Sequence, residues 1–495
     1  MKNFSIASLP IYRWRYALSY ILIGATLAFL IILAALYTPG GLTPEETEKA
    51  VLVSDITSYE AITPQTVIDL PHHVLQKLSL FTLGVTQLSI KLPSLLLGAI
   101  TSVALILLLH RWFRPNVAIL TAVVVISTGQ FLFITQSGTS AILYLLWPSL
   151  ILLFSTLIMQ KAKYAMAWYV LLFIAIALSL YSPLSLYIAV ALLIAALAHP
   201  KLRLSLRSLP FNVVAAPALI GLVVLVPLIT HVFEEPSIAL TLLGIPSTMP
   251  DIWQNTVLVF RQYFDFISPS SGRIMSPVLG LGSLALITLG FVTIFRSRYT
   301  IRSYTIISWL ILLIPIIIVQ PYFLPVIFVP LMLVMAIGID TLIREWYKLF
   351  PQNPYARFAG LIPIGVLIFT LVATGVERFV YGYHYDPQIS QHFSRDARLL
   401  HETIDDKSGD ISLVVTEEEK SFYSTMAENP HTFPGTTVRV TATDETNSSI
   451  INSPQVVYSR AAHDKTQPQQ LPAEITVSAF SRESDRFYVY KNEEK

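Results

Sequence analysis

The sequence predicts a polytopic α-helical membrane protein with about eleven transmembrane helices and a small α/β domain at its C-terminal end. Long apolar stretches recur through the first 380 residues, and Lys and Arg gather in every second gap between them. After Arg378 the composition becomes polar and charged. The 495 residues are 54% hydrophobic and 13% charged, whereas a soluble domain carries roughly 25% charged residues. These observations exclude an ordinary soluble protein.

The apolar stretches give the approximate limits of each span, because a helix that crosses the hydrocarbon core needs about 20 apolar residues. The first stretch, of about 22 residues, is too long for the hydrophobic region of a cleaved signal, so we expect an uncleaved span. The stretches at 165–181 and 184–199 meet at a tight turn and leave two alternatives open, two full spans or one hairpin that does not fully cross. The predicted spans are 16–38, 88–109, 116–134, 141–159, 165–181, 184–199, 212–231, 275–295, 303–320, 323–343 and 358–377.

The distribution of Lys and Arg predicts the orientation, because short cytoplasmic loops are enriched in these residues. One set of gaps holds about three times as many of them as the other set. We therefore expect a cytoplasmic N-terminus in the plasma membrane of a bacterium, and an odd number of spans then places the C-terminus outside. The poorer, outer set holds only Lys49, Lys77, Lys91, Arg261 and Arg273.

Two domains follow from this pattern. The first, 1–380, is a transmembrane domain with long outer loops at 39–87 and 232–274, and residues 72–84 are expected to form a short interfacial helix. The second, 381–495, is a soluble extracytoplasmic α/β domain without a catalytic signature. Runs of β-branched and aromatic residues predict strands at 411–416, 437–440, 455–459 and 487–490, and helices are expected at 393–404 and 417–427.

Several classes of chemistry are excluded by what the sequence lacks. It has no cysteine, so disulfides, thiolate metal sites and cysteine nucleophiles are ruled out. The middles of the predicted spans are almost free of ionisable residues, which argues against an ion-coupled carrier. No metal-type His/Cys cluster is visible, and we expect no metal, no other cofactor and no nucleic-acid partner. The pattern favours chemistry at a membrane surface, with spans that anchor the protein and shape a lipid-facing groove.

An acidic cluster follows the first predicted span and offers candidate catalytic groups. Glu45 or Glu46 can act as a general base at the membrane surface, where partial desolvation would raise the pKa of the carboxylate usefully. The alternative interpretation is local: Thr43 is a helix N-cap, Pro44 the first helical residue, and Glu46 the partner in a capping box. The two interpretations are compatible, since a capped helix would hold a base rigidly. Asp69 is a second candidate acid, with a helix N-cap as its alternative role.

Candidate groups for a substrate phosphate are the outer cations. Arg273 is preferred, because it ends a long outer loop next to a span and a guanidinium binds phosphate in a bidentate manner. Lys77 and Arg261 are further candidates, and the alternative for each cation is that its side chain reaches lipid head groups. His72 and His73 are possible hydrogen-bond donors. Adjacent histidines on a helix point about 100° apart, so they form a poor metal chelate.

Four segments carry a resemblance to a known superfamily. Their sequences are GLTPEE at 41–46, IKLPSLLLG at 90–98, RWFR at 111–114 and PYFLP at 321–325. In this order they resemble the GT-C glycosyltransferases, in the branch of the protein O-mannosyltransferases and the lipid A aminoarabinose transferase. The resemblance covers about residues 15–180 and 300–380.

The resemblance implies a function. Such enzymes move a sugar from a polyprenyl-phosphate carrier to a hydroxyl on a protein, lipid or glycan, on the outer face of the membrane. The acid pair Glu45 and Glu46 would lie at the catalytic centre, and no nucleotide-binding domain is needed. The expected partners are a polyprenyl-phosphate-linked sugar, membrane lipids and an acceptor in the cell envelope.

The sequence departs from the pattern of this branch at three places. Glu45 stands where Asp is usual, residues 136–141 contain neither the usual Arg nor the usual Asp, and Pro321 replaces a basic residue. The predicted function is an inverting membrane glycosyltransferase. The alternatives are a catalytically inactive envelope protein on the same scaffold, with a lipid-binding or assembly role, and a lipid-carrier flippase or transporter.

Overall fold

The structure is a computed structural model that describes residues 21, 24–25, 27–29, 41–56, 61–207, 211–266, 277–297, 299–349, 354–382, 392–405, 410–445, 455–466, 474–477 and 486–491. Most of the predicted first span at 16–38 lies outside these residues, and Arg273 also lies outside them.

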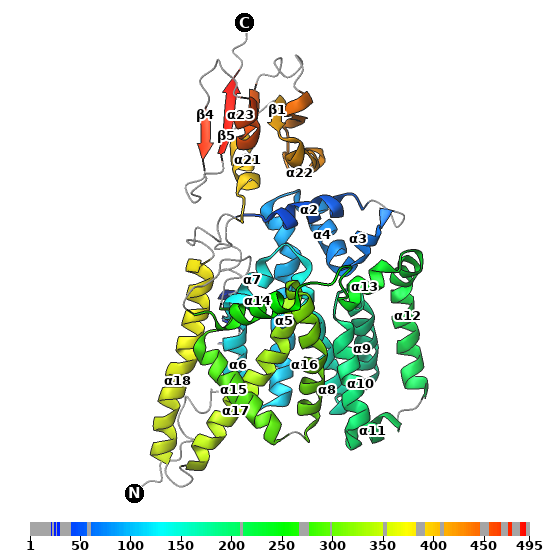
Figure 1. The fold of residues 1–495 in the computed structure, drawn as a ribbon, viewed down its shortest axis with the longest axis vertical. Coiled ribbons are helices and arrows are strands. Elements are labelled where there is room, and N and C mark those ends of the chain that lie inside the picture. The colour runs from blue at the N-terminus through cyan, green and yellow to red at the C-terminus, as the bar shows by residue number, and fades with distance from the viewer. Residues whose placement is uncertain are drawn as a thin grey trace.

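Every predicted span from residue 88 onward corresponds to a helix, and these helices form one bundle (Figure 1). Their bounds are α5 Gln87–Trp112, α6 Pro115–Ile126, α7 Gly129–Gln136, α8 Leu143–Met159, α9 Ala165–Ser179, α10 Leu186–Ala198, α12 Phe211–Glu234, α15 Leu281–Arg296, α16 Ile301–Val319, α17 Phe328–Leu349 and α18 Pro354–Glu377. Shorter helices connect them: η3 Ser140–Ile142, α11 Pro200–Arg207, α13 Ser237–Leu243, α14 Ile252–Phe264, η4 Pro321–Ile327 and the π-helical turn η5 Arg378–Gly382.

The number of full spans differs from the prediction. Within the described residues, six helices are long and apolar enough to cross a membrane, or seven if α6 and α7, bent by 60°, count as one span. The helices α9, α10 and α15 have 15, 13 and 16 residues, and at 1.5 Å per residue they are shorter than the hydrocarbon core of about 30 Å. The prediction of a polytopic helical membrane protein is therefore confirmed, whereas about eleven full crossings are not.

Small residues allow a close contact between two helices of the bundle, α15 and α17. A Cβ atom on Gly290 of α15 would lie 2.1 Å from the carbonyl oxygen of Val334, and one on Gly338 of α17 would lie 2.0 Å from that of Leu286. The backbones of α15 and α17 approach each other at these glycines, as small residues permit in membrane helices. This contact holds α17, the helix that directly follows η4, against α15.

The segment after the first predicted span forms three helices at one end of the bundle. These are α2 Pro44–Ser54, α3 Pro64–Val67 and α4 Leu70–Leu83. The predicted capping box at the start of α2 is present: the Thr43 hydroxyl accepts from the Glu46 N–H at 3.3 Å, and Glu46 Oε2 accepts from the Thr43 N–H at 2.8 Å. The interfacial helix expected at 72–84 corresponds to α4, and Val74 and Phe81 are exposed on it.

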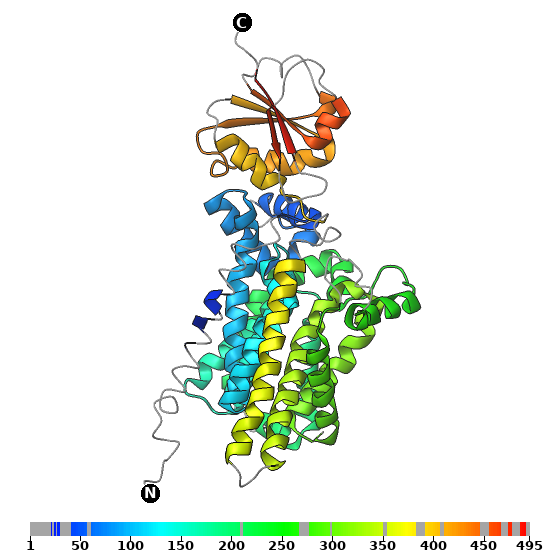
Figure 2. The same cartoon turned by 90° about the vertical axis from the view of Figure 1, so that its left-hand side faces the viewer.

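The C-terminal part of the chain forms a five-stranded sheet with three helices, beyond α2 and α4 (Figures 1 and 2). The strand order is β2-β1-β3-β5-β4; β1 pairs in parallel with β2 and β3, while β5 pairs antiparallel with β3 and β4. The strand β4 was not expected, because its four residues are too short for a clear pattern. The elements are α21 Asp396–Asp405, β1 Asp410–Val415, α22 Glu417–Glu428, β2 Thr437–Ala442, the short η6 Thr443–Glu445, β3 Gln455–Ser459, α23 Arg460–Thr466, β4 Glu474–Val477 and β5 Arg486–Lys491.

Candidate active site

Glu46 is a buried anchor of α2. Its side chain is 1% exposed. One carboxylate oxygen closes the capping box, and the other accepts from the Gly138 N–H at 2.5 Å and from the Ser137 hydroxyl at 3.4 Å. Both oxygens are thus committed to groups of the protein, which ties α2 to the turn that follows α7.

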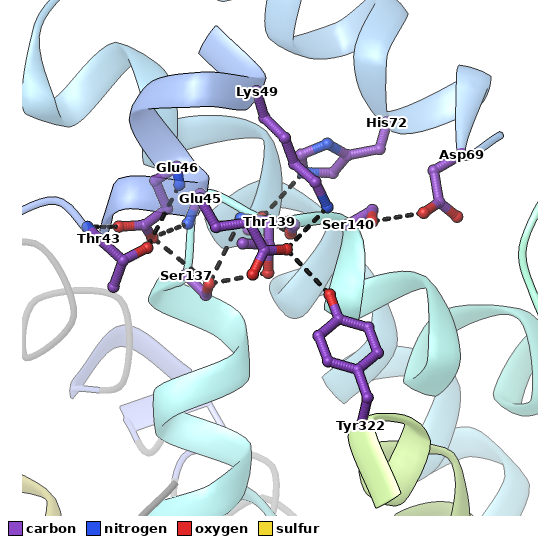
Figure 3. Close-up of polar contacts among 12 residues, drawn as sticks. Thr43, Glu45, Glu46, Lys49, Asp69, His72, Ser137, Thr139, Ser140 and Tyr322 are labelled. Atoms are coloured by element: carbon purple, nitrogen blue, oxygen red, sulfur yellow. Dashed lines mark hydrogen bonds and ion pairs between the residues drawn. The ribbon is translucent and has the colours of Figure 1, made fainter. Parts of the chain in front are cut away.

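Glu45 lies on a different face of α2 from Glu46 and is partly exposed (Figure 3). Consecutive helical residues point about 100° apart, so the two acids face different surroundings. The Tyr322 hydroxyl donates to Glu45 Oε1 at 2.9 Å, and the Lys49 ammonium lies 3.0 Å from the same oxygen. The side chains of Glu45 and Lys49 are each 24% exposed. The Glu45 carboxylate is therefore fixed by Tyr322 and Lys49 and remains accessible to solvent.

Tyr322 comes from η4, the turn that carries the PYFLP sequence. Its ring packs edge-on against Phe323, with centroids 5.4 Å apart, and Phe323 packs edge-on against the buried Tyr144 of α8 at 6.1 Å. The Tyr322 side chain remains 60% exposed. Residues of two of the resembling segments, 41–46 and 321–325, therefore meet at one carboxylate oxygen.

Lys49 keeps its charge in this setting. Burial lowers its pKa, but the interactions with Tyr322, Glu45 and Asp69 raise it more, and the pKa of Lys49 lies above its usual range. The ammonium is therefore protonated at neutral pH. It is a cation 3.0 Å from the carboxylate of the candidate base.

Asp69 is buried and strained, and its side chain does not cap α4. It lies at the N-cap position with a left-handed backbone (φ 59°), and it makes no side-chain capping bond. Instead, Oδ2 accepts from the Ser140 hydroxyl at 2.5 Å, while Oδ1 has no partner among the described residues. Asp69 therefore stands at the N-cap position of α4, as the alternative expects, but its side chain makes no capping bond. Its carboxylate joins the start of α4 to η3.

His72 and His73 are directed into the protein. His72 Nε2 lies 3.0 Å from the Ser94 hydroxyl, which donates to the Thr139 carbonyl, so the imidazole N–H must be on Nε2. His73 Nδ1 lies 3.0 Å from the Thr66 carbonyl. Burial lowers the pKa of both, and for His72 the neighbouring charges of His73 and Lys49 lower it further. Both imidazoles are neutral near pH 7 and link α4 to its neighbours.

The structure describes two of the predicted cations, Lys77 and Arg261. Lys77 donates to the Ser54 carbonyl at 2.5 Å, at the C-terminal end of α2, where a cation stabilises the helix dipole. Arg261 is exposed on α14. Arg273 lies outside the described residues.

Two residues of the site were not predicted as site residues. Lys49 follows Glu45 by four residues, a spacing that pairs charges on one helix face, so its position carried the signal. Tyr322 is harder to predict, since the sequence marks it only as part of the PYFLP segment that carries the resemblance. The part of the chain that the structure describes contains no group of three or more His, Cys, Asp or Glu that could hold a metal ion.

Comparison with known proteins gives a family match over part of the chain. The model of the dolichyl-phosphate-mannose-protein mannosyltransferase family matches residues 72–231. No curated protein matches the chain by sequence.

Two solved structures of ArnT share the fold at low identity. ArnT from Cupriavidus metallidurans bound to undecaprenyl phosphate is 12% identical, with a TM-score of 0.54 over 95% of this chain and 97% of that chain. ArnT from the same organism in the apo state is 13% identical, with a TM-score of 0.53 over 96% and 98%. The oligosaccharyltransferase of Archaeoglobus fulgidus tethered with an acceptor peptide is 11% identical, with a TM-score of 0.49 over 90% and 69%.

The match to the mannosyltransferase family and the shared fold of ArnT confirm the resemblance found in the sequence. The chain is similar to the dolichyl-phosphate-mannose-protein mannosyltransferase family over residues 72–231, and it shares the fold of ArnT.

Proposed function

We propose that this protein is an inverting membrane glycosyltransferase that moves a sugar from a polyprenyl-phosphate donor to a hydroxyl of an envelope acceptor. The observation that carries the proposal is the partly exposed Glu45 carboxylate, held by Tyr322 and Lys49 where two segments of the GT-C pattern meet. The similar ArnT structure, which contains undecaprenyl phosphate, supports the donor class.

In the proposed reaction Glu45 is the general base. Its carboxylate takes the proton of the acceptor hydroxyl as that oxygen attacks C1 of the sugar. The bond between C1 and the phosphate oxygen breaks, and the polyprenyl phosphate leaves with the electron pair. Attack from the face opposite the phosphate inverts the anomeric carbon.

Two neighbours support this step. Tyr322 fixes the carboxylate through its hydroxyl, which limits the positions the base can adopt. Lys49 supplies positive charge where negative charge develops on the leaving phosphate. Glu46, whose oxygens are already bonded to protein groups, holds the helix that carries the base.

The proposal includes the location and orientation that the sequence predicts. In it the N-terminus is cytoplasmic and α2, η4 and the domain at 381–495 lie outside, at a bacterial plasma membrane. The domain at 1–380 then presents Glu45 to the leaflet from which an isoprenoid donor is used. Arg273 remains a proposed contact for the donor phosphate, since it ends the second outer loop.

One observation favours a second candidate, an inactive protein on the same scaffold. The turn at 137–140, which contacts both Glu46 and Asp69, consists of Ser, Gly and Thr residues and carries no charge. A site that lacks a charge here has fewer groups to stabilise a transition state.

A transfer assay with the purified full-length chain in proteoliposomes separates the two. The donors are radiolabelled polyprenyl-phosphate sugars, and the acceptors are an extract of envelope lipids, glycans and proteins. We expect donor-dependent transfer with inverted anomeric configuration in the product, absent from liposomes without the protein. No transfer from any donor favours the inactive scaffold, whereas movement of intact donor across sealed vesicles would indicate a flippase.

A further inference from the structure

We infer that Lys91, together with Phe393 and Ser394 from the C-terminal part of the chain, forms a clamp that positions the helix carrying Glu45. The clamp is hydrogen-bonded to Gly41 and Leu42, immediately before the capping box of α2. The inference rests on the proposed function for its effect on turnover, but the clamp itself is a property of the fold.

The first half of the clamp is a buried lysine. Lys91 lies in the first turns of α5 and is 1% exposed. Its ammonium donates to the Gly41 carbonyl at 2.8 Å, and the Glu46 carboxylate interacts favourably with its charge. A buried ammonium costs free energy unless it is bonded and compensated. The contact therefore joins α5 to the chain four residues before Glu45.

The second half is a short strand pairing. The Leu42 N–H donates to the Ser394 carbonyl at 2.7 Å, and the Ser394 N–H donates to the Leu42 carbonyl at 2.9 Å. A Cβ atom on Gly41 would lie 2.6 Å from the Ser394 carbonyl oxygen, so only glycine permits this approach. The Phe393 ring lies 6.0 Å from the Lys91 ammonium, within cation–π range.

The rest of α2 is held by the same C-terminal part of the chain. Ala50 and Val53 of α2 share a hydrophobic core with Leu400 of α21 and Met426 of α22. This packing holds α2 against the C-terminal part of the chain, while Glu45 is bonded to Tyr322 of the bundle.

Two further bonds fix α4, which lies beside α2. Asn429 donates to the Leu80 carbonyl at 3.0 Å, and the Val85 N–H donates to the Thr432 hydroxyl at 2.9 Å. The segment carrying the candidate base thus lies between the bundle and the C-terminal domain, and is bonded to both.

The clamp affects the position of the base and takes no part in the chemical step. A base and its acceptor must be held within about 0.5 Å of the productive arrangement, and small misplacements can cost about 100-fold in rate. Lys91 and Ser394 touch neither reacting group in the proposed reaction, so they are positioning residues. The C-terminal domain, which has no catalytic signature of its own, gains a role through this contact.

The test uses two variants that open the clamp by different means. Lys91→Met removes the ammonium and its bond to Gly41 while keeping the length of the side chain, and Lys91→Arg keeps a donor. Gly41→Ala leaves the buried charge in place and pushes against Ser394. The matched controls are Lys348→Met, at an exposed lysine, and Gly365→Ala, at a glycine whose added Cβ meets nothing within 4 Å.

The first measurement is hydrogen exchange of the α2 amides in the full-length protein in lipid nanodiscs. We expect exchange to rise at least about tenfold in Lys91→Met and Gly41→Ala, the size expected for a lost bond to a charged group. It should be unchanged in both controls and near wild type in Lys91→Arg, and the amides of α8 should not respond. Wild-type exchange of α2 in both opening variants would overturn the clamp.

The second measurement is transfer. We expect kcat to fall at least about tenfold in the two opening variants with the KM for the lipid-linked donor within about twofold, and Lys91→Arg to recover most of kcat. Raised exchange with unchanged kcat would overturn the positioning role. If the wild type transfers no sugar, the proposed function fails, and hydrogen exchange still decides whether the clamp exists.

Discussion

The Tyr322 hydroxyl donates a hydrogen bond of 2.9 Å to Glu45 Oε1, across 277 residues of sequence. The bond joins the helix after the first predicted span to the turn before α17. Because Lys49 lies 3.0 Å from the same oxygen, the carboxylate is fixed from two sides while its side chain remains partly exposed. This arrangement distinguishes Glu45 from Glu46, which is buried.

The first prediction concerns Tyr322. Tyr322→Phe keeps the ring and removes the hydroxyl that bonds Glu45, while the ion pair with Lys49 remains, so kcat for transfer should fall about tenfold with little change in stability. Steady-state kinetics and thermal unfolding measure the two effects. Tyr355→Phe, at a tyrosine 85% exposed on α18, is the matched control and should behave as wild type. A Tyr322→Phe protein with wild-type kcat would show that the bond has no part in turnover.

The second prediction concerns Glu46. In Glu46→Gln the amide can offer an oxygen to only one of the N–H groups of Thr43 and Gly138, and its own NH₂ faces the other. The free energy of unfolding should fall by about 1–3 kcal/mol. Thermal unfolding in detergent checks this, with Glu48→Gln as control, since Glu48 is exposed on the same helix. Equal stability of both variants would refute the anchoring role.

The third prediction concerns Gly138. An added Cβ would lie 2.7 Å from Ile90 Cγ2 and 3.3 Å from Glu46 Oε1. Gly138→Ala should therefore displace the turn, and both folded yield and transfer should fall. Gly365→Ala provides the comparison, because its Cβ meets nothing within 4 Å. Normal yield and activity in Gly138→Ala would mean that this turn tolerates a shift.

The fourth prediction concerns acid pH. The pKa of His72 in the folded protein is lowered below its unfolded value of about 6.5, so the unfolded chain binds the extra proton first. The stability from the neutral imidazole is complete above about pH 6.5 and declines as pH falls below that value. Thermal unfolding between about pH 5 and 7.5 should show this slope, and His72→Gln should flatten it.

The control for that measurement is His110→Gln, at an exposed histidine on α5, which should leave the slope unchanged. A slope that persists undiminished in His72→Gln would assign the acid sensitivity to another group.

Much of the fold could be predicted from hydropathy alone. Each apolar stretch from residue 88 onward is a helix, because a chain must satisfy its backbone groups internally in a membrane. The number of crossings could not be predicted, since hydropathy does not separate a full span from a shorter apolar helix such as α10. The bend of 60° between α6 and α7 also divides a stretch that reads as continuous.

The site was predicted in part. The acidic cluster was correctly singled out as a structured helix start, and the capping box indicates that Glu46 faces inward. The two partners of Glu45 differ in how far the sequence predicts them. Lys49 lies four residues after Glu45 on the same helix, whereas Tyr322 meets Glu45 only through the tertiary fold. The bond of Asp69 to Ser140 is likewise a tertiary contact that no local pattern reveals.

A comparison of Gln variants decides whether Glu45 or Glu46 is the general base. Transfer from a radiolabelled polyprenyl-phosphate sugar is measured per folded molecule for the wild type, Glu45→Gln, Glu46→Gln and Glu48→Gln. We predict a loss of about 100-fold or more in kcat for Glu45→Gln, the size expected for a missing general base, and less than about tenfold for the other two. Turnover by Glu45→Gln equal to that of Glu48→Gln would contradict the assignment of Glu45 as the base.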